Sequence, residues 1–274
     1  MKKAIITGIT GQDGSYLAKL LLSKGYKVYG AQRRNTGLKH WRLDELGITD
    51  QIEFLDFDLG EPYNIEKTID KVQPDEFYNL AAQSFVGLSF EQPQVTTIAN
   101  ALGVLNILEV IRNKYPKIKF YQASTSEMFG KVQETPQTET TRFYPRSPYG
   151  VAKCYSHYMT VNYRESYDLF ACSGILFNHE SPMRGEEFVT RKITKGLVEY
   201  TQTGKVLELG NIETFRDWGH AEDYVEAMWL MLQQDEPDDY VIATGRTVSI
   251  KDFITLCLDE LNLAYEFNGH EVID

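Results

Sequence analysis

Cysteine is scarce in this sequence and is never clustered. Among its 274 residues there are only three cysteines, Cys154, Cys172 and Cys257, and no Cys-x-x-Cys pair. A sparse, odd set of thiols does not build a disulfide framework, which argues against a small secreted scaffold. Such cysteine usage is typical of a protein kept in a reducing compartment, so we expect a cytoplasmic location.

Long apolar runs and an excess of positive charge are also missing. After the basic start Met1-Lys2-Lys3, the apolar run Ala4–Ile6 is too short for an export signal, and no run approaches the roughly 18 residues of a membrane span. The 28 lysines and arginines face 39 aspartates and glutamates, a formal net charge of −11. Binding to a phosphate backbone needs a basic face. We therefore expect neither a nucleic acid partner nor a membrane partner. We also expect no metal site.

The sequence does contain a regular alternation of short apolar runs and amphipathic stretches. It predicts strands over Lys3–Gly8, Lys27–Gln32, Ile52–Leu59, Glu76–Ala81, Lys119–Thr125 and Ala171–Asn178, with helices over Ser15–Lys24, Pro62–Val72, Val95–Lys114 and Pro148–Tyr167. This alternation is typical of βα units, so we expect an α/β fold with a doubly wound parallel sheet (Rossmann) over residues 1–178.

The regularity loosens after Asn178, and residues 179–274 are expected to form a smaller substrate-binding lobe that interleaves with the first. A loop is predicted over His179–Glu187, and Ser249-x-x-Asp252 predicts a capping box at the start of the last helix. The other predicted elements are helices over Thr190–Thr201 and Ala221–Gln234, and strands over Val206–Leu209 and Tyr240–Thr244.

Three glycines lie between the first predicted strand and the first predicted helix, in the run Gly8-Ile9-Thr10-Gly11-Gln12-Asp13-Gly14. Glycines permit a tight turn and let the backbone approach a diphosphate, which the positive end of the helix also attracts. The spacing is G-x-x-G-x-x-G rather than G-x-G-x-x-G. In its strand–turn–helix context the run favours a dinucleotide site over a plain turn.

Two arginines follow the second predicted strand. An NAD site usually has a carboxylate at this point for the ribose hydroxyls, whereas arginine accommodates the 2′-phosphate of NADP. Arg33 and Arg34 therefore favour NADP, the alternative being a solvated surface pair.

A Tyr-x-x-x-Lys pair stands at the start of the helix predicted over Pro148–Tyr167. Tyr149 and Lys153 share one helix face, and Ser147 as N-cap with Pro148 at the first position would start the helix just before the tyrosine. A free tyrosine has a pKa of about 10, so it needs a nearby cation to act as a base. Lys153 is such a cation.

The fifth predicted strand ends in the polar run Ser124-Thr125-Ser126-Glu127. Ligands bind at the carboxyl ends of strands in this kind of sheet. Alternation would put Thr125 and Glu127 on the same side if the strand continues. The alternative is that the run caps a helix.

Together the glycine turn, this strand end and the Tyr-x-x-x-Lys pair resemble an extended short-chain dehydrogenase/reductase. Longer blocks resemble the GDP-mannose 4,6-dehydratase family and run through nearly the whole chain. Among them are GITGQDGSYLA, YNLAAQS, FYQASTSEMFG, FYPRSPYGVAK, GILFNHESP and RDWGHAEDYV. The chain stops at Asp274, short of the family's C-terminal segment, so we expect part of the sugar-nucleotide pocket to be missing.

The resemblance implies roles for individual residues. Catalytic positions are Thr125, Glu127, Tyr149 and Lys153. Cofactor contacts are implied for Gly8, Ile9, Thr10, Gly11, Gln12, Asp13, Arg33, Arg34, Asp58, Leu59, Leu80, Ala81, Ala82, Gln83, Ser84, Tyr149, Lys153, His179 and Arg184. Substrate contacts are implied for Ser84, Thr125, Ser126, Glu127, Tyr149, Asn178, Arg191 and Arg216.

The implied reaction converts GDP-mannose to GDP-4-keto-6-deoxymannose by internal hydride transfer from C4 to C6 through bound NADP, in a homodimer or homotetramer. Another GDP sugar, such as a GDP-heptose, is an alternative substrate. An NADP-dependent epimerase or reductase would need Tyr149 and Lys153 but no base for C5, so Glu127 argues against it. A non-catalytic NADP-binding sensor would need only the glycine turn.

Overall fold

The computed structural model describes residues 1–34, 40–268 and 271–273, and the chain divides into two compact units. Unit 1 comprises Met1–Phe177 and Ala221–Ile242, and unit 2 comprises Asn178–His220 and Ala243–Asp274. The first segment of unit 1 ends at Phe177, one residue before the boundary expected after Asn178. Ala221–Ile242, expected in the second lobe, belongs instead to unit 1, because it supplies a helix and the last strand of the large sheet.

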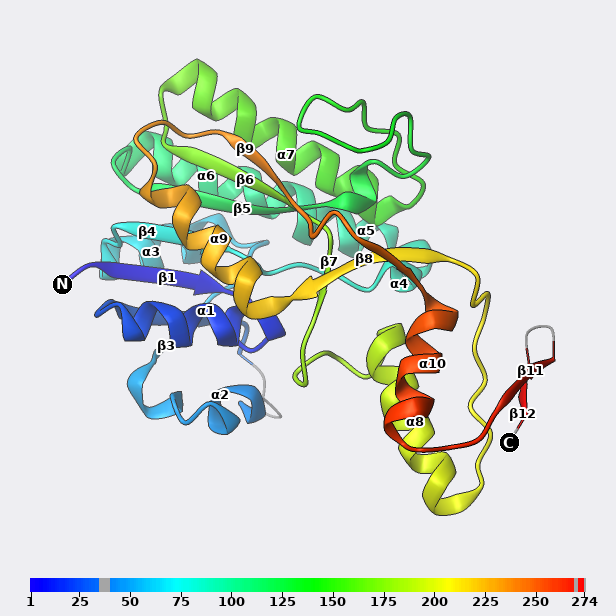
Figure 1. Ribbon diagram of the computed structural model, residues 1–274. Coiled ribbons are helices and arrows are strands. Elements are labelled where there is room, and N and C mark those ends of the chain that lie inside the picture. The colour runs from blue at the N-terminus through cyan, green and yellow to red at the C-terminus, as the bar shows by residue number, and fades with distance from the viewer. Residues whose placement is uncertain (35–39, 269–270, 274) are drawn as a thin grey trace. The chain divides into compact units, whose positions relative to one another are not determined.

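Unit 1 is built on a seven-stranded parallel sheet in the order β3-β2-β1-β4-β5-β6-β9 (Figure 1). The strands are β1 Lys3–Thr7, β2 Lys27–Gln32, β3 Glu53–Asp56, β4 Glu76–Asn79, β5 Lys119–Thr125, β6 Ala171–Leu176 and β9 Asp239–Ile242. The strand order reverses between β1 and β4, where doubly wound sheets bind dinucleotides at the carboxyl ends of the strands. The expected fold class is confirmed.

The helices of unit 1 cover both faces of this sheet (Figure 1). They are α1 Gln12–Ser23, α2 Trp41–Glu45, α3 Pro62–Val72, α4 Val86–Glu91, α5 Pro93–Thr97, α6 Gly103–Lys114, α7 Pro148–Tyr167 and α9 Ala221–Gln233, with short turns η1 Thr49–Gln51 and η3 Ser126–Met128. Helix α1 packs on α9, and α6 packs on α3 and α7. Ile5, Phe77 and Phe120 of the sheet belong to an apolar core that also contains residues of α3, α6 and α7.

The helix expected over Val95–Lys114 is not continuous. A π-helical segment, η2 Ile98–Leu102, separates α5 from α6. The apolar repeat did not reveal it, because a π turn shifts the helix by one residue while the pattern stays helical. Two short helices, α2 and α4, were not expected.

Unit 2 has its own small sheet and its own core. Its elements are β7 Asn178–Glu180, α8 Val189–Thr203, β8 Phe215–His220, β10 Thr247–Ser249, α10 Ile250–Glu260, β11 Glu266–Asn268 and β12 Glu271–Ile273. Strand β8 pairs with both β7 and β10, and Ile193, Leu197 and Leu258 lie in an apolar cluster between α8 and α10.

Two local expectations for unit 2 had different outcomes. The capping box is confirmed, since Ser249 Oγ accepts the Asp252 amide (3.0 Å) and Asp252 Oδ2 accepts the Ser249 amide (3.1 Å). The strand expected over Val206–Leu209 is wrong. That segment pairs with no strand, and Leu207 and Leu209 pack against the apolar cluster instead.

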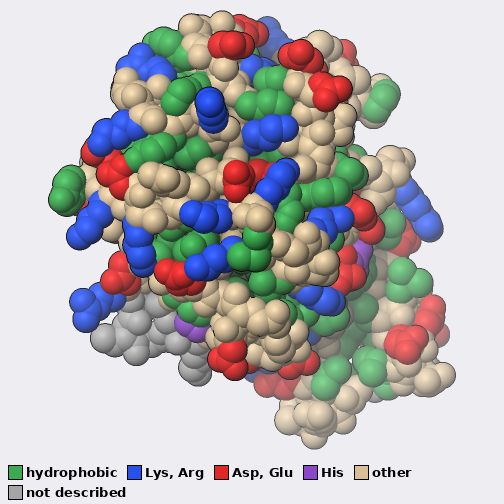
Figure 2. Space-filling model, turned by 90° about the vertical axis from the view of Figure 1, so that its left-hand side faces the viewer, with side chains coloured by type: hydrophobic (Ala, Val, Ile, Leu, Met, Phe, Trp, Pro, Cys, Tyr) green, Lys and Arg blue, Asp and Glu red, His purple; other side chains and the backbone are tan. Residues whose placement is uncertain are grey.

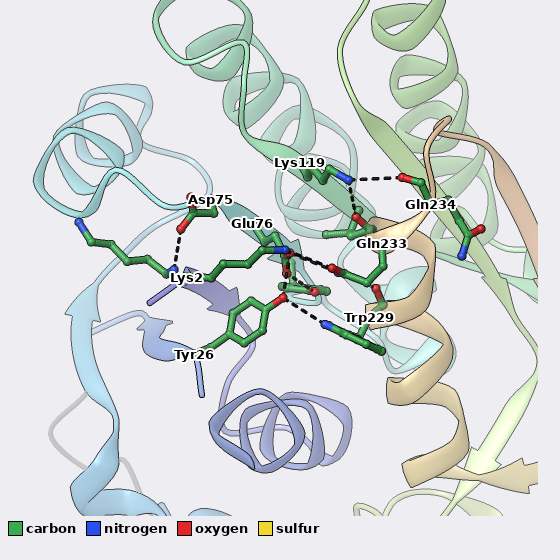
Figure 3. A network of polar contacts seen from close by, with 11 residues as sticks. Lys2, Tyr26, Asp75, Glu76, Lys119, Trp229, Gln233 and Gln234 are labelled. Carbon is green, nitrogen blue, oxygen red and sulfur yellow. Dashed lines mark hydrogen bonds and ion pairs between the residues drawn. The ribbon is translucent and has the colours of Figure 1, made fainter. Parts of the chain in front are cut away.

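At the amino ends of the strands, β4 begins with a buried carboxylate. Glu76 is 1% exposed and accepts hydrogen bonds from Lys2 Nζ (2.9 Å), Tyr26 OH (3.0 Å), Tyr78 OH (2.7 Å) and Gln233 Nε2 (3.2 Å) (Figure 3). Because the donors come from β4, α9 and the segments before β1 and β2, this network ties α9 to the sheet.

The surface carries charges of both signs. On the face shown in Figure 2, lysine and arginine side chains are interspersed with aspartate and glutamate. Glu53 of the edge strand β3, for example, pairs with Lys27 (3.2 Å) and Lys71 (3.3 Å). This face therefore presents no continuous basic field of the kind that a nucleic acid requires.

Candidate functional site

The glycine turn after β1 is tightly constrained. Gly8 has φ +69°, and a Cβ there would lie 3.0 Å from backbone atoms of Leu80 and Ala81. A Cβ on Gly14 would lie only 2.3 Å from the Gly8 carbonyl oxygen, so α1 packs against the turn only because that position is glycine. Gly11, the N-cap of α1, has no side chain to cover the helix end. The turn therefore brings closely packed backbone to the N-terminus of α1, and its contact with a diphosphate stays a prediction.

The residues 80–84, which follow β4, are held by a side chain that the sequence did not single out. Asn100 Oδ1 accepts the Gln83 amide (2.8 Å), and Asn100 Nδ2 donates to the Gln83 carbonyl (2.9 Å). Asn100 is 1% exposed and lies in the π-helical segment, a feature that often occurs at functional sites. The only sign of this role in the sequence is an asparagine, Asn100, within an otherwise apolar helical run.

Arg33 and Arg34 are exposed after the end of β2, and Asp58 follows the end of the neighbouring β3. The carboxylate of Asp58 accepts the Gly60 amide (2.9 Å), which forms a tight turn. In the part of the chain that the structure describes, neither guanidinium is engaged in an ion pair, and both remain accessible to an anion.

The Tyr-x-x-x-Lys pair lies in the first turns of α7, as expected. Ser147 Oγ accepts the Gly150 amide (3.0 Å) at the N-cap, and Pro148 is the first helical residue. Lys153 is 3% exposed, and its Nζ donates to the Ala123 carbonyl (2.7 Å) and lies 5.8 Å from the ring centroid of Tyr149. Burial lowers the pKa of Lys153 to about 8. That the Lys153 ammonium makes Tyr149 a base stays a prediction.

The polar run after β5 turns instead of continuing as a strand. Thr125 is the last strand residue, and its Oγ1 accepts the Glu127 amide (3.2 Å) at the start of η3. The condition of the alternation argument is therefore not met, because the strand ends at Thr125 and this residue caps η3. A ligand-binding role for the run stays a prediction. A Cβ on Gly150 would lie 2.9 Å from the Glu127 carbonyl oxygen, so this glycine lets Glu127 approach the turn of α7 that carries Tyr149.

A buried histidine lies one turn after Lys153. His157 Nδ1 lies 3.2 Å from Ser124 Oγ, and its Nε2 lies 4.0 Å from Asp239, which also pairs with Arg164 (2.7 Å). Burial lowers the pKa of His157. Helix α7 thus contacts the end of β5 at two successive turns, through Lys153 and His157.

Unit 2 carries the other predicted residues. Asn178 and His179 lie on β7, paired with Trp218 and Gly219 of β8. Arg191 lies on α8, and Arg216 of β8 is exposed. Their contact with cofactor or substrate stays a prediction.

Two charged residues of unit 2 have clear local partners. The Arg184 guanidinium pairs with Glu180 (3.2 Å) and stacks on the Phe188 ring (3.6 Å to the centroid). Asp217, next to Arg216, is buried and accepts hydrogen bonds from the Thr244 amide (3.0 Å), the Thr244 hydroxyl (2.8 Å) and the Gly245 amide (2.8 Å). Its carboxylate therefore fixes the turn at 244–245.

The described residues give little support to a metal site or to a membrane span. Within residues 1–34, 40–268 and 271–273, no group of three or more His, Cys, Asp or Glu side chains is arranged to hold a metal ion. Among the described residues, the helical stretch Pro93–Lys114, which comprises α5, η2 and α6, is long and apolar enough by composition to cross a membrane, but half of its most apolar window is buried inside the protein. A core helix of a water-soluble protein passes the same test, so this is weak support for a membrane span.

The parallel sheet with its order reversed at β1, the glycine turn and the Tyr149–Lys153 pair beside the end of β5 define a short-chain dehydrogenase/reductase. The family model described as GDP-mannose 4,6 dehydratase matches residues 5–274, and the chain belongs to that family. It is accordingly a dehydratase that works with a nicotinamide cofactor.

Individual relatives agree with this assignment. GDP-mannose 4,6-dehydratase of Vibrio cholerae serotype O1 is 54% identical over 279 residues, which cover 99% of this chain and 75% of that protein. GDP-mannose 4,6 dehydratase of Homo sapiens is 51% identical over 260 residues, which cover 92% and 70%. The chain thus spans about three quarters of the length of these relatives.

Solved structures show the same fold. UDP-glucose 4-epimerase of Thermotoga maritima, with UDP-glucose, superposes with a TM-score of 0.85 at 25% identity and covers 96% of this chain and 84% of that one. dTDP-glucose 4,6-dehydratase of Streptomyces venezuelae, with NAD bound, gives a TM-score of 0.85 at 22% identity, covering 96% and 82%. The second likeness shows the fold alone.

Proposed function

We propose that the protein converts GDP-mannose to GDP-4-keto-6-deoxymannose, and that Thr125, Glu127, Tyr149 and Lys153 carry the reaction. The names of relatives more than half identical to this chain support the substrate. The observation that carries the assignment of residues is their convergence, since the end of β5 and the first turns of α7 approach each other at Gly150 and at Lys153.

The residues of unit 1 fit a dinucleotide. Cβ atoms at Gly8 and Gly14 would collide with neighbouring backbone, so these glycines allow the close packing of the turn, the segment after β4 and helix α1 that a dinucleotide turn needs. Residues 80–84 would form the neighbouring wall, clamped by Asn100. When bound, the nicotinamide supplies an acceptor and donor of hydride. We assign it as NADP because Arg33 and Arg34 are accessible where the 2′-phosphate would lie.

Protons are moved by the chain's own side chains. Tyr149, as phenolate beside the Lys153 ammonium, takes the proton of the C4 hydroxyl, while Thr125 hydrogen-bonds to the C4 oxygen. Oxidation at C4 to a ketone makes the C5 hydrogen acidic. Glu127 removes that proton as a general base and, as the carboxylic acid, gives it to the C6 hydroxyl, which leaves as water.

Two substitutions separate these steps. Tyr149→Phe should lower kcat by roughly 10²–10⁴-fold, because it removes the first proton acceptor. Glu127→Gln should stop the loss of water, while absorbance of reduced nicotinamide still appears in a single turnover. Glu91→Gln, an exposed change on α4, is the matched control and should leave the rate unchanged. Near-normal turnover in folded Tyr149→Phe protein would overturn the assignment.

The choice of NADP has its own test. Replacing Arg33 and Arg34 with serine should weaken NADP+ far more than NAD+, by about 1.5–3 kcal/mol for each charged hydrogen bond lost. Arg142→Ser, at an exposed arginine elsewhere in unit 1, is the control. Equal losses for both cofactors, measured by calorimetry, would mean that the pair does not contact the 2′-phosphate.

We also propose a homodimer or homotetramer, supported by an apolar face that α5, η2 and α7 leave exposed. Helix α7 packs directly on α5 and on η2. The exposed members of this face are Val95, Ile98, Leu102, Val151, Tyr155 and Tyr158. A second copy would cover them, so Ile98→Glu should shift the protein toward a monomer in sedimentation, and an unchanged mass would contradict this interface.

A cytoplasmic location completes the proposal. All three cysteines are free thiols. Burial raises the pKa of Cys154 and Cys172 to about 11, which keeps these thiols protonated and poorly reactive. A reducing compartment suits a protein whose thiols form no disulfide.

A further inference from the structure

A row of buried polar side chains crosses the sheet beneath the site. Thr7, Asn79 and Gln122 are direct neighbours across the register of β1, β4 and β5. Thr7 is 0% exposed, and Asn79 and Gln122 are each 1% exposed. Polar side chains buried this deeply in a sheet need partners, and these three supply them to one another.

The row begins at the backbone that lines the glycine turn. The amides of Leu80 and Ala81 both donate to Thr7 Oγ1, each at 3.0 Å. The Thr7 hydroxyl then donates to Asn79 Oδ1 (2.8 Å). Since Gly8 packs against the same two residues, this end of the row is part of the cofactor turn.

The row ends at the catalytic lysine. Asn79 Nδ2 donates to Gln122 Oε1 (2.9 Å), and Gln122 Nε2 donates to the Ala123 carbonyl (3.0 Å). The same carbonyl accepts Lys153 Nζ at 2.7 Å. Two donors therefore share one carbonyl oxygen, one of them the ammonium group beside Tyr149.

The direction of every bond in the row follows from its first member. A hydroxyl that accepts two amide protons must donate its own, so the oxygen of Asn79 faces Thr7. That orientation makes Asn79 a donor to Gln122, which in turn makes Gln122 a donor to Ala123. The amide group of Gln122 cannot flip without breaking a buried hydrogen bond, which costs about 1–3 kcal/mol.

We propose that Gln122 is a positioning residue for Lys153, and that the Thr7–Asn79–Gln122 row fixes the catalytic ammonium relative to the cofactor turn. The proposal rests on the catalytic role of Lys153 proposed above. A lysine side chain is flexible, and Ala123 O is the hydrogen-bond acceptor that holds its Nζ. Gln122 sets how that oxygen is oriented and how much of its electron density remains for the ammonium.

Burial accounts for the lowered pKa of Lys153, and no charged group contributes to it within the described part of the chain. The elements packed against α7 nevertheless carry ionisable side chains that the experiment must keep constant. On α7 they are Tyr149, Cys154, Tyr155, His157, Tyr158, Tyr163, Arg164, Glu165 and Tyr167. On the elements packed against α7 they are Lys119 and Tyr121 of β5, Glu127 of η3, Cys172 of β6, Glu109, Arg112 and Lys114 of α6 and Glu91 of α4.

Two variants of Gln122 change the row in graded steps. Gln122→Met removes the second donor on the Ala123 carbonyl, and Gln122→Glu also adds a carboxyl group close to the ammonium. Both should raise the pKa of Lys153, by a few tenths in the first case and by about one unit or more in the second. The titration is followed by NMR of protein carrying ¹³C at the lysine ε-carbon, with the Lys153 signal assigned by its loss in Lys153→Met.

Kinetics give the second readout. If turnover needs the Lys153 ammonium, the alkaline limb of the kcat/KM profile should move to higher pH in Gln122→Glu. A shift of one unit corresponds to a roughly fivefold higher relative kcat/KM near pH 9. If Gln122 had a purely structural role, its substitution would lower kcat or stability. The pKa of Lys153 and the alkaline limb of the kcat/KM profile would then stay at their wild-type values.

The outcomes separate this inference from the proposed function. Full activity in Lys153→Met would overturn the catalytic role of the lysine and the inference with it. An inactive Lys153→Met together with an unshifted Lys153 titration in folded Gln122→Glu protein would overturn the inference alone. If Gln122→Glu does not fold, an unchanged pKa and an unchanged alkaline limb in Gln122→Met overturn it equally.

Discussion

Replacing Lys153 with methionine should abolish turnover and yet stabilise the protein near neutral pH. Burial lowers the pKa of Lys153 from 10.5 to about 8. A difference of about 2.5 units corresponds to roughly 3 kcal/mol of instability carried by the buried ammonium at neutral pH. Methionine removes that cost and loses only the hydrogen bond that a neutral amine would make to Ala123, worth about 0.5–1.5 kcal/mol. The net gain expected near pH 7 is about 2 kcal/mol.

The pH dependence makes this prediction sharper. Between the folded pKa of about 8 and the unfolded value of 10.5, the unfolded chain binds a proton at Lys153 that the folded chain does not. Wild-type stability should therefore rise with pH across this window, by roughly 3 kcal/mol relative to the methionine variant. All other groups titrate in both proteins and cancel in the difference.

Urea unfolding near pH 7 and near pH 10.5 measures this difference directly. The variant should be the more stable protein at the lower pH and the less stable one at the higher pH. Lys67→Met, at an exposed lysine of α3, serves as the control and should show no such reversal. A stability difference between wild type and Lys153→Met that does not change with pH would refute the reasoning.

Three further changes test other parts of the structure. Glu76→Leu leaves buried donors unpaired at the amino end of β4 and should lower the free energy of unfolding by about 2–4 kcal/mol, whereas an unchanged urea midpoint would argue against the network. Asn100→Ala releases residues 80–84 and should weaken cofactor binding roughly tenfold with the fold intact; calorimetry that finds equal affinity would contradict the clamp. Asp217→Ala removes three accepted hydrogen bonds and should speed amide exchange at 244–245, and protection equal to wild type would show that this carboxylate is dispensable.

The sequence predicts the sheet and the local frame of the site well, because their signals are local. Strands covered on both faces are short runs of apolar residues, and each of β1 to β6 lies within or close to its predicted run. The start of α7 is set by Ser147 and Pro148, and the turn after β1 is set by its own glycines, so each signal lies within a few residues of the structure it predicts. Local chemistry of this kind needs no knowledge of distant partners.

The parts that the sequence did not predict depend on distant partners. No local feature shows that Ala221–Ile242 returns to unit 1, since a helix and a strand look the same in either unit. The Thr7–Asn79–Gln122 row exists only because the register of three strands aligns those positions. In the sequence Asn100 is only a polar residue within an apolar run, and its role depends on the hydrogen bond with Gln83, which is 17 residues away.

The central claim is an internal hydride transfer followed by loss of water, and the position of an isotopic label tests it most directly. The purified protein is incubated with GDP-mannose that carries deuterium at C4, without added NADPH, and the product is examined by NMR and mass spectrometry. The account predicts a 4-keto product with deuterium at C6 and a solvent hydrogen at C5. Deuterium retained at C4, or a stoichiometric requirement for NADPH, would contradict the account and indicate an epimerase or a reductase.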